Sequence, residues 1–134
     1  MKSIRIRTNK RVEIIDITSK VEDILKDTNI DDGIAVIFTK HTTTALAINE
    51  YEPGLIQDLE NMLEKLVPEN AGYLHDRIDN NADSHLRAML LNSFLVIPIM
   101  SKKLGLGTWQ RILFLELDGP REREITISVI SQNE

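Results

Sequence analysis

Cysteine is absent from this chain of 134 residues, which excludes a disulfide framework and a thiolate site. A metal ion would therefore have to be held by imidazole and carboxylate groups. Positive charge is also scarce, because 16 Lys and Arg residues face 21 Asp and Glu residues and give a formal net charge of −5. Such a chain has no excess positive field to attract phosphates, so we expect neither nucleic acid nor an anionic membrane as a partner.

Long apolar runs and familiar enzyme motifs are missing as well. Residues 1–7 alternate polar and apolar side chains, unlike a signal peptide or a membrane span, so we expect a soluble, cytoplasmic protein. The chain has no P-loop, dinucleotide fingerprint, nucleophile elbow or basic aromatic face. Several large classes of enzyme and of nucleic-acid-binding protein are thereby disfavoured.

The length fits one domain, residues 1–134, with a single core. Apolar patterning predicts about seven strands, over 3–8, 12–17, 34–38, 43–48, 94–99, 112–117 and 125–130. We expect the first two strands to form a hairpin and the next two to pair. The strands come in pairs instead of alternating with helices, which is typical of an α+β fold.

Three helices are predicted by start signals and apolar spacing. Ser19 and Glu22 have the spacing of a capping box, Pro53 suits a first helical position, and Asn81 offers a cap for the third helix. The apolar face expected for that helix consists of Leu86, Met89 and Leu90. Such modest helices can hardly cover strands that are apolar on both faces, so we predict a homo-oligomer.

The histidines are His41 at a turn, His75 in a long loop and His85 at a helix start. Three imidazoles are enough for a zinc-type site with an open position for water or substrate. Their spacing is a weak signal, because no two of them lie four residues apart on one helix. From spacing alone, three unrelated surface or capping histidines are the alternative.

Other polar residues have a structural and a functional interpretation each. Glu50, after Asn49 at a strand end, is a general base, a metal ligand or a carboxylate that favours the next helix. Asn81 is a cap or part of a phosphate site with Arg87. Trp109 and Gln110 form a pocket wall, or Trp109 is a core indole. Arg121 and Arg123 are an anion clamp or solvated turn residues.

Five segments in order resemble the YjbQ family, also called UPF0047, across residues 3–130. They are HTTTALAINE at 41–50, Tyr73-Leu74-His75, NADSHLRAMLLNS at 81–93, LGTWQ at 106–110 and ELDGPRER at 116–123. The resemblance implies a compact α+β homotrimer in which His41, His75 and His85 converge on a polar pocket and hold zinc or another divalent ion. Further family motif positions are matched by Asn49, Glu50, Asn81, Arg87, Trp109, Gln110 and Arg121.

The resemblance also implies a secondary thiamine-phosphate synthase activity, which joins a pyrimidine diphosphate to a thiazole phosphate. The resulting hypothesis is a metal-assisted transferase with a phosphorylated or anionic ligand on Arg87 and Arg121, and with Glu50 as base. The alternatives are a non-catalytic oligomer that binds a metabolite or metal, and a metal-dependent hydrolase.

One distance limits this hypothesis. Between His41 and the Asn49-Glu50 pair, about eight residues further on, an extended strand would span roughly 26 Å. Either the strand bends, or Asn49 and Glu50 act in a different part of the site, toward a neighbouring subunit.

Overall fold

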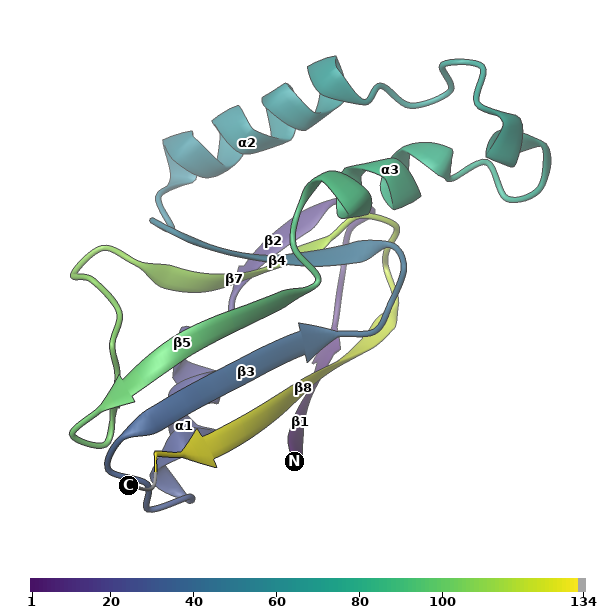
Figure 1. The fold of residues 1–134 in the computed structure, drawn as a ribbon. Helices are drawn as coiled ribbons and strands as arrows, with labels where there is room; N and C mark the ends of the chain where they lie inside the picture. The colour runs from purple at the N-terminus through teal and green to yellow at the C-terminus, as the bar shows by residue number, and fades with distance from the viewer. Residues whose placement is uncertain (133–134) are drawn as a thin grey trace.

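Two antiparallel β-sheets stack face to face in the computed structural model, which describes residues 1–132 (Figure 1). One sheet has the strand order β1-β8-β3-β5-β6, and the other has the order β2-β7-β4. The strands are β1 (Lys2–Arg7), β2 (Glu13–Asp16), β3 (Gly33–Thr39), β4 (Thr44–Asn49), β5 (Phe94–Met100), β6 (Lys103–Leu104), β7 (Arg111–Glu116) and β8 (Glu122–Ser131). Every predicted strand is present, and the short β6 is additional.

The main core lies between the two sheets. Side chains alternate along each strand, so Ile125 and Ile127 of β8 point inward together with Ile37 of β3. They meet Ile112 and Phe114, which β7 contributes from the facing sheet. These rows of buried side chains pack the two sheets against each other.

Three α-helices complete the domain: α1 (Thr18–Lys26), α2 (Pro53–Leu66) and α3 (Ala82–Leu90). Helices α2 and α3 cover the outer face of the three-stranded sheet, where Leu63 packs on Leu113 and Leu115 (Figure 1). Strand β7 is therefore buried on both faces, as its apolar run predicts. Helix α1 packs at the open end of the sheets, and the short 3-10 helix η1 (Leu74–Arg77) precedes α3. Among residues 1–132, no helix has the length and apolar character to cross a membrane.

The expected strand pairings are wrong. Strand β1 pairs with β8, whereas β2 pairs with β7 in the other sheet, so the first two strands form no hairpin. Strand β3 pairs with β5 and β8, and β4 pairs with β7. The physical reason is that β7 is buried on both faces, so its backbone N–H and C=O groups need a hydrogen-bonded strand at each edge, which β2 and β4 supply. The chain therefore changes sheet at every connection between successive strands except β5 to β6.

The start of α1 also differs from its prediction. The helix begins at Thr18, so Ser19 is already its second residue and forms no capping box with Glu22. Instead, Asp16 Oδ1 accepts hydrogen bonds from the backbone N of Thr18 at 3.0 Å and from its hydroxyl at 2.6 Å. A carboxylate two residues upstream thus replaces the expected hydroxyl cap.

Helix α3 presents the opposite face from the one predicted. Asp83, Ser84 and Arg87 are buried, whereas Met89 is 76% exposed and Leu90 is 64% exposed. The buried groups have partners: Arg11 binds Asp83, and the Ser84 hydroxyl donates to the carbonyl of Leu117 at 2.6 Å. Burying polar groups is tolerated when they are hydrogen-bonded. Polar contacts thus hold much of the inner face of the helix, next to the buried Ala82 and to Ala88, which packs on the core, while Met89 and Leu90 remain at the surface.

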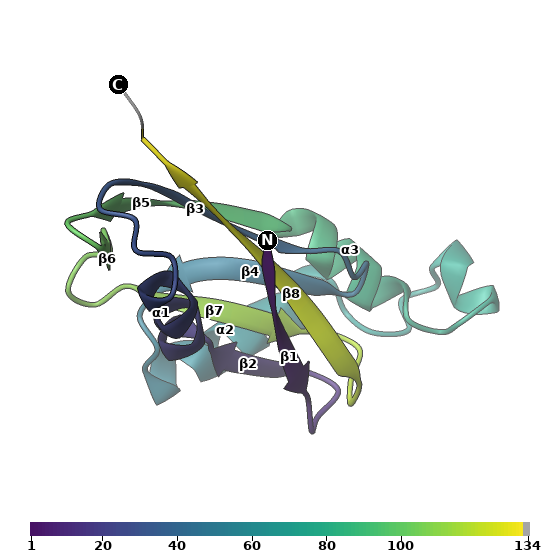
Figure 2. The same cartoon turned by 90° about the horizontal axis from the view of Figure 1, so that it is seen from below.

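The outer face of the five-stranded sheet is apolar and exposed over β3 and β5. Phe94 is 56% exposed and Val96 is 51% exposed, and Phe38 lies opposite Phe94 in the register of β3 and β5. Helices α2 and α3 lie on the far side of the three-stranded sheet (Figures 1 and 2). The strand over 34–38, predicted to be covered on both faces, is therefore covered by this chain on one face.

Candidate functional site

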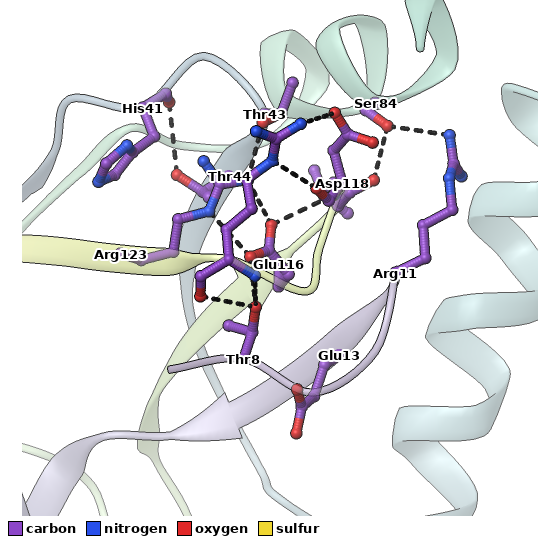
Figure 3. A network of polar contacts seen from close by, with 12 residues as sticks. Thr8, Arg11, Glu13, His41, Thr43, Thr44, Ser84, Glu116, Asp118 and Arg123 are labelled. Atoms are coloured by element: carbon purple, nitrogen blue, oxygen red, sulfur yellow. Dashed lines mark hydrogen bonds and ion pairs between the residues drawn. The ribbon is translucent and has the colours of Figure 1, made fainter. Parts of the chain in front are cut away.

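The turn that carries His41 joins β3 to β4 and is held by its own hydroxyl groups. The hydroxyls of Thr39 and Thr44 are 2.7 Å apart, and the Thr44 hydroxyl also donates to the carbonyl of His41 at 3.4 Å. The hydroxyl of Thr43 accepts from Nη2 of Arg123 at 2.9 Å (Figure 3). The threonines thus stabilise the turn and connect it to β8.

Beneath the turn lies a buried ion pair between β7 and β8. Nε of Arg123 donates to Oε1 of Glu116 at 2.8 Å, and both side chains are at most 5% exposed. The hydroxyl of Thr8 donates to the same carboxylate oxygen at 2.7 Å (Figure 3). Since a buried charge needs both a counter-charge and hydrogen bonds, this network fixes the backbone around residue 123.

That backbone determines the proton position on His41. The N–H of Glu124, directly after Arg123, donates to Nε2 of His41 at 3.0 Å. Nε2 must then be unprotonated, so the neutral ring carries its proton on Nδ1. Burial and the nearby Arg123 guanidinium hold the pKa of His41 below its usual value. The structure therefore favours a neutral His41 whose Nδ1–H is a donor.

We expect nitrogen-15 NMR to show the Nδ1–H tautomer of His41 and a titration midpoint below about 6.5. The His41→Gln variant assigns the signals. Because the folded-state pKa is lowered, neutral His41 stabilises the fold above the unfolded-state pKa. This contribution is lost as the pH falls through the folded-state pKa. An Nε2–H tautomer in the folded protein would contradict the assignment.

His85 and His75 lie side by side at the start of α3 and in η1. Their ring centroids are 4.7 Å apart at an interplanar angle of 80°. His85 also faces His41 across a cavity of about 410 Å³, which we call the histidine pocket. Its lining consists of Lys40, His41, Thr42, Thr43, Asp79, Asn81, His85, Asp118, Arg121 and Arg123.

Hydrogen bonds order one wall of the histidine pocket. Asp118 Oδ2 accepts from Nδ2 of Asn81 at 2.8 Å and from Nη2 of Arg121 at 3.2 Å. This link joins the β7–β8 turn to the start of α3. Asn81 occupies the N-cap position of α3, but its side chain binds Asp118 and forms no cap hydrogen bond. The capping interpretation of Asn81 is therefore wrong, whereas a ligand-binding role for its Oδ1 stays a prediction.

Two buried side-chain atoms lack a hydrogen-bond partner within residues 1–132, namely His75 Nε2 and Asn81 Oδ1. Asn81 lines the histidine pocket, and His75 contacts its neighbour His85. Unpaired buried polar atoms are costly and infrequent in folded proteins, and a binding site is one place where they occur. Their position next to His85 marks this region as the candidate site.

The three histidines do not fit a shared metal ion in this arrangement. Residues 1–132 contain no group of three or more His, Asp or Glu side chains placed to hold one. Moreover, Nε2 of His41 already accepts the N–H of Glu124, and its Nδ1 is left protonated. An ion at this site would need a rearranged His41 or ligands from outside the chain. The chemistry considered below therefore uses no metal ion.

Asn49, Glu50, Trp109 and Gln110 lie at the other end of the strands. In the regular register of β4 and β7, Thr44 pairs with Glu116 near the histidine pocket, whereas Asn49 pairs with Arg111 far along the strand. Glu50 lines a separate pocket between β4 and α2. Trp109 is 72% exposed, so it is not a core indole. Strand β4 does not bend these residues toward His41, and a role for them at a neighbouring subunit stays a prediction.

Arg87 lies outside the histidine pocket as well. It is 3% exposed, and its Nε donates to the carbonyl of Val67 at 3.0 Å. This guanidinium ties α3 to the end of α2, and a catalytic role for it stays a prediction that the geometry does not favour. The chain brings together four predicted site residues, His41, His85, Asn81 and Arg121, with His75 against His85.

Lys40 and Asp118 were missed by sequence reasoning. Asp118 and Arg121 lie in the turn between β7, which ends at Glu116, and β8, which begins at Glu122. The alternation of charges around this turn was the available signal. Lys40 offered none beyond its position next to His41.

Known proteins of similar sequence and fold identify the family of this chain. The model of the family described as UPF0047 protein YjbQ-like matches residues 2–132. A UPF0047 protein of Archaeoglobus fulgidus is 54% identical over 127 residues, which cover 95% of this chain and 98% of the relative. A YbjQ-like protein of unknown function from Sulfolobus solfataricus has a solved structure with a TM-score of 0.95, 39% identity and coverage of 98% of this chain and 96% of that chain. The chain belongs to the UPF0047, YjbQ-like family.

Proposed function

We propose that the histidine pocket binds a phosphorylated or otherwise anionic small molecule. The observation that carries this proposal is the gathering of Lys40, Arg121 and two histidines around one cavity in a chain of net charge −5. Asp118 and Glu116 offset the charges of Arg121 and Arg123 and orient these guanidinium groups. Asp79 also lines the pocket and opposes the charge of Lys40, so the pocket offers oriented hydrogen-bond donors and not a large positive charge. Oriented donors of this kind recognise phosphate and carboxylate oxygens.

The same donors suit group transfer. Neutral His41 with its Nδ1–H can donate to an oxygen that gains negative charge, while His85, on the facing wall, can accept or return a proton. Thiamine-phosphate synthesis, expected from the resemblance, is one reaction of this class, because a diphosphate leaves as the new bond forms. Non-catalytic binding of an anionic metabolite is the alternative use of the same donors.

Titration calorimetry with inorganic pyrophosphate tests the pocket. We expect Lys40→Gln to weaken binding about tenfold, because a charged hydrogen-bond donor contributes about 1.5 kcal/mol. Lys20→Gln, an exposed lysine on α1, is the matched control and should bind like the original protein. Equal weakening by both variants, or no binding to the unaltered chain, would refute the proposal.

A turnover assay then separates catalysis from binding. Thiamine phosphate formation is measured for the unaltered chain and for His85→Gln, with and without added zinc. If His85 transfers a proton, the variant should lose about 10²–10⁴-fold in rate. Pyrophosphate binding without turnover would instead favour the non-catalytic alternative. A rate that depends on zinc would contradict chemistry without a metal ion.

We also propose that the chain assembles as a homotrimer through the outer face of the five-stranded sheet. Large exposed apolar patches mark interaction sites, and this face carries Phe38, Phe94, Val96 and Ile130 at the surface. In sedimentation equilibrium we expect the mass of a trimer, and Val96→Lys should shift it toward the monomer. Thr126→Lys, on the neighbouring strand β8, tests whether the interface extends beyond the apolar patch. A monomer at micromolar concentration would exclude the assembly.

A further inference from the structure

A second cavity adjoins the histidine pocket and has a different character. It measures about 410 Å³ and is lined largely by carbon, from Tyr73, Leu74, Leu86 and Met89, with His75 and His85 at its base. We call it the apolar hollow. Two of its lining side chains are largely accessible to solvent, because Leu74 is 75% exposed and Met89 is 76% exposed. The hollow exists because α3 turns its polar face inward and leaves its apolar residues outside.

The apolar hollow and the histidine pocket share one lining residue, His85. A third cavity of about 440 Å³ shares His85 and Met89 with the hollow, and shares His85, His41 and Lys40 with the histidine pocket. His85 therefore lines all three cavities and lies where the polar lining of the histidine pocket meets the apolar lining of the hollow. A molecule that contacted both linings would lie near His85.

We infer that the ligand of this site is amphipathic, with an anionic group at Lys40 and Arg121 and a flat apolar group in the apolar hollow. The inference rests on the proposed function and names the class of ligand. Small-molecule sites commonly combine an apolar lining with a few fixed polar groups, in cavities of about 300–1,000 Å³. The unbranched side chain of Met89 adapts readily to the outline of a ring. The bond between the anionic and apolar groups would lie against His85.

Two phosphate monoesters of matched charge test this inference by calorimetry. Phenyl phosphate should bind about tenfold more tightly than methyl phosphate, because a ring buried in the hollow removes apolar surface from water. Leu74→Ser and Met89→Ser should each reduce this ratio to about threefold or less, while leaving the affinity for methyl phosphate unchanged. Leu66→Ser, which alters a leucine of α2 that is 63% exposed, is the matched control and should preserve the ratio.

The possible outcomes distinguish the two proposals. If neither ester binds, the inference fails, and the proposed function fails with it when inorganic pyrophosphate does not bind either. If both bind with equal affinity, the anion site stands and the amphipathic ligand is excluded. A tenfold ratio that survives both hollow variants would place the ring elsewhere and would also overturn the inference.

Discussion

Replacing Glu116 with alanine is expected to lower the free energy of unfolding by about 3–5 kcal/mol, the range for removing one partner of a buried ion pair. Glu116 is fully buried, and its carboxylate is bound by Arg123, by the Thr8 hydroxyl and by the backbone N of Asp118. Without it, the guanidinium of Arg123 stays in the interior with no counter-charge. Urea denaturation at one fixed protein concentration measures the change.

Two further variants identify the cause. Glu122→Gln removes an exposed carboxylate that pairs with Arg7 at 3.7 Å, and such surface pairs contribute about 0–1 kcal/mol. The double variant Glu116→Leu with Arg123→Met deletes both charges, so it should be less destabilised than Glu116→Ala alone. If the double variant were the less stable of the two, uncompensated charge would not be the reason for the loss.

Replacing Asp83 with alanine is the second change with a large expected effect, again about 3–5 kcal/mol. Asp83 is 1% exposed and receives two hydrogen bonds from Arg11, at 3.1 and 3.0 Å, with Nη2 of Arg87 at 3.8 Å. The hydrogen bond to Asp83 is the main reason that the pKa of Arg11 is raised. Removing this carboxylate leaves Arg87 buried without it, and between the β1–β2 connection and α3 it leaves the hydrogen bond from Arg11 to the Ser84 hydroxyl at 3.3 Å.

Hydrogen exchange locates the effect, because local loss of α3 should raise exchange in this helix more than in α2. Asp58→Ala on α2 is the matched control, since Asp58 is exposed and such surface changes cost within about 0.5 kcal/mol. A variant of Asp83 as stable as the Asp58 control would mean that α3 is held by its apolar contacts instead.

The strands and α2 were predictable because their signals are local. Alternation identifies β1 and β8, and a proline followed by leucines three and four residues apart identifies α2. The choice of strand partners is not a local property. Strand β7 pairs with β2 and β4, which lie far from it in the sequence, and this pairing depends on how the layers pack on both faces of β7. The orientation of α3 escaped prediction because its apolar residues follow a helical period, while the partners of its polar face are remote, such as Arg11, 72 residues from Asp83.

The site was predictable in part for the same reason. Motif order pointed to His41, His85, Asn81 and Arg121, which the fold brings together, and also to Glu50 and Trp109, which it places at the opposite strand ends. Proximity in a motif such as residues 41–50 does not imply proximity in space, because a strand carries its two ends apart. The length of that strand was the one feature of the sequence which indicated that His41 and Glu50 lie apart.

The donor that sets the proton position on His41 is a main-chain N–H, that of Glu124. Nineteen of the twenty amino acids supply this group, and only proline lacks it. Position 124 can therefore vary freely in side chain while the imidazole keeps its tautomer. Residues that govern the site need not be recognisable by their identity, and a relative with another amino acid at this position would retain the same histidine chemistry.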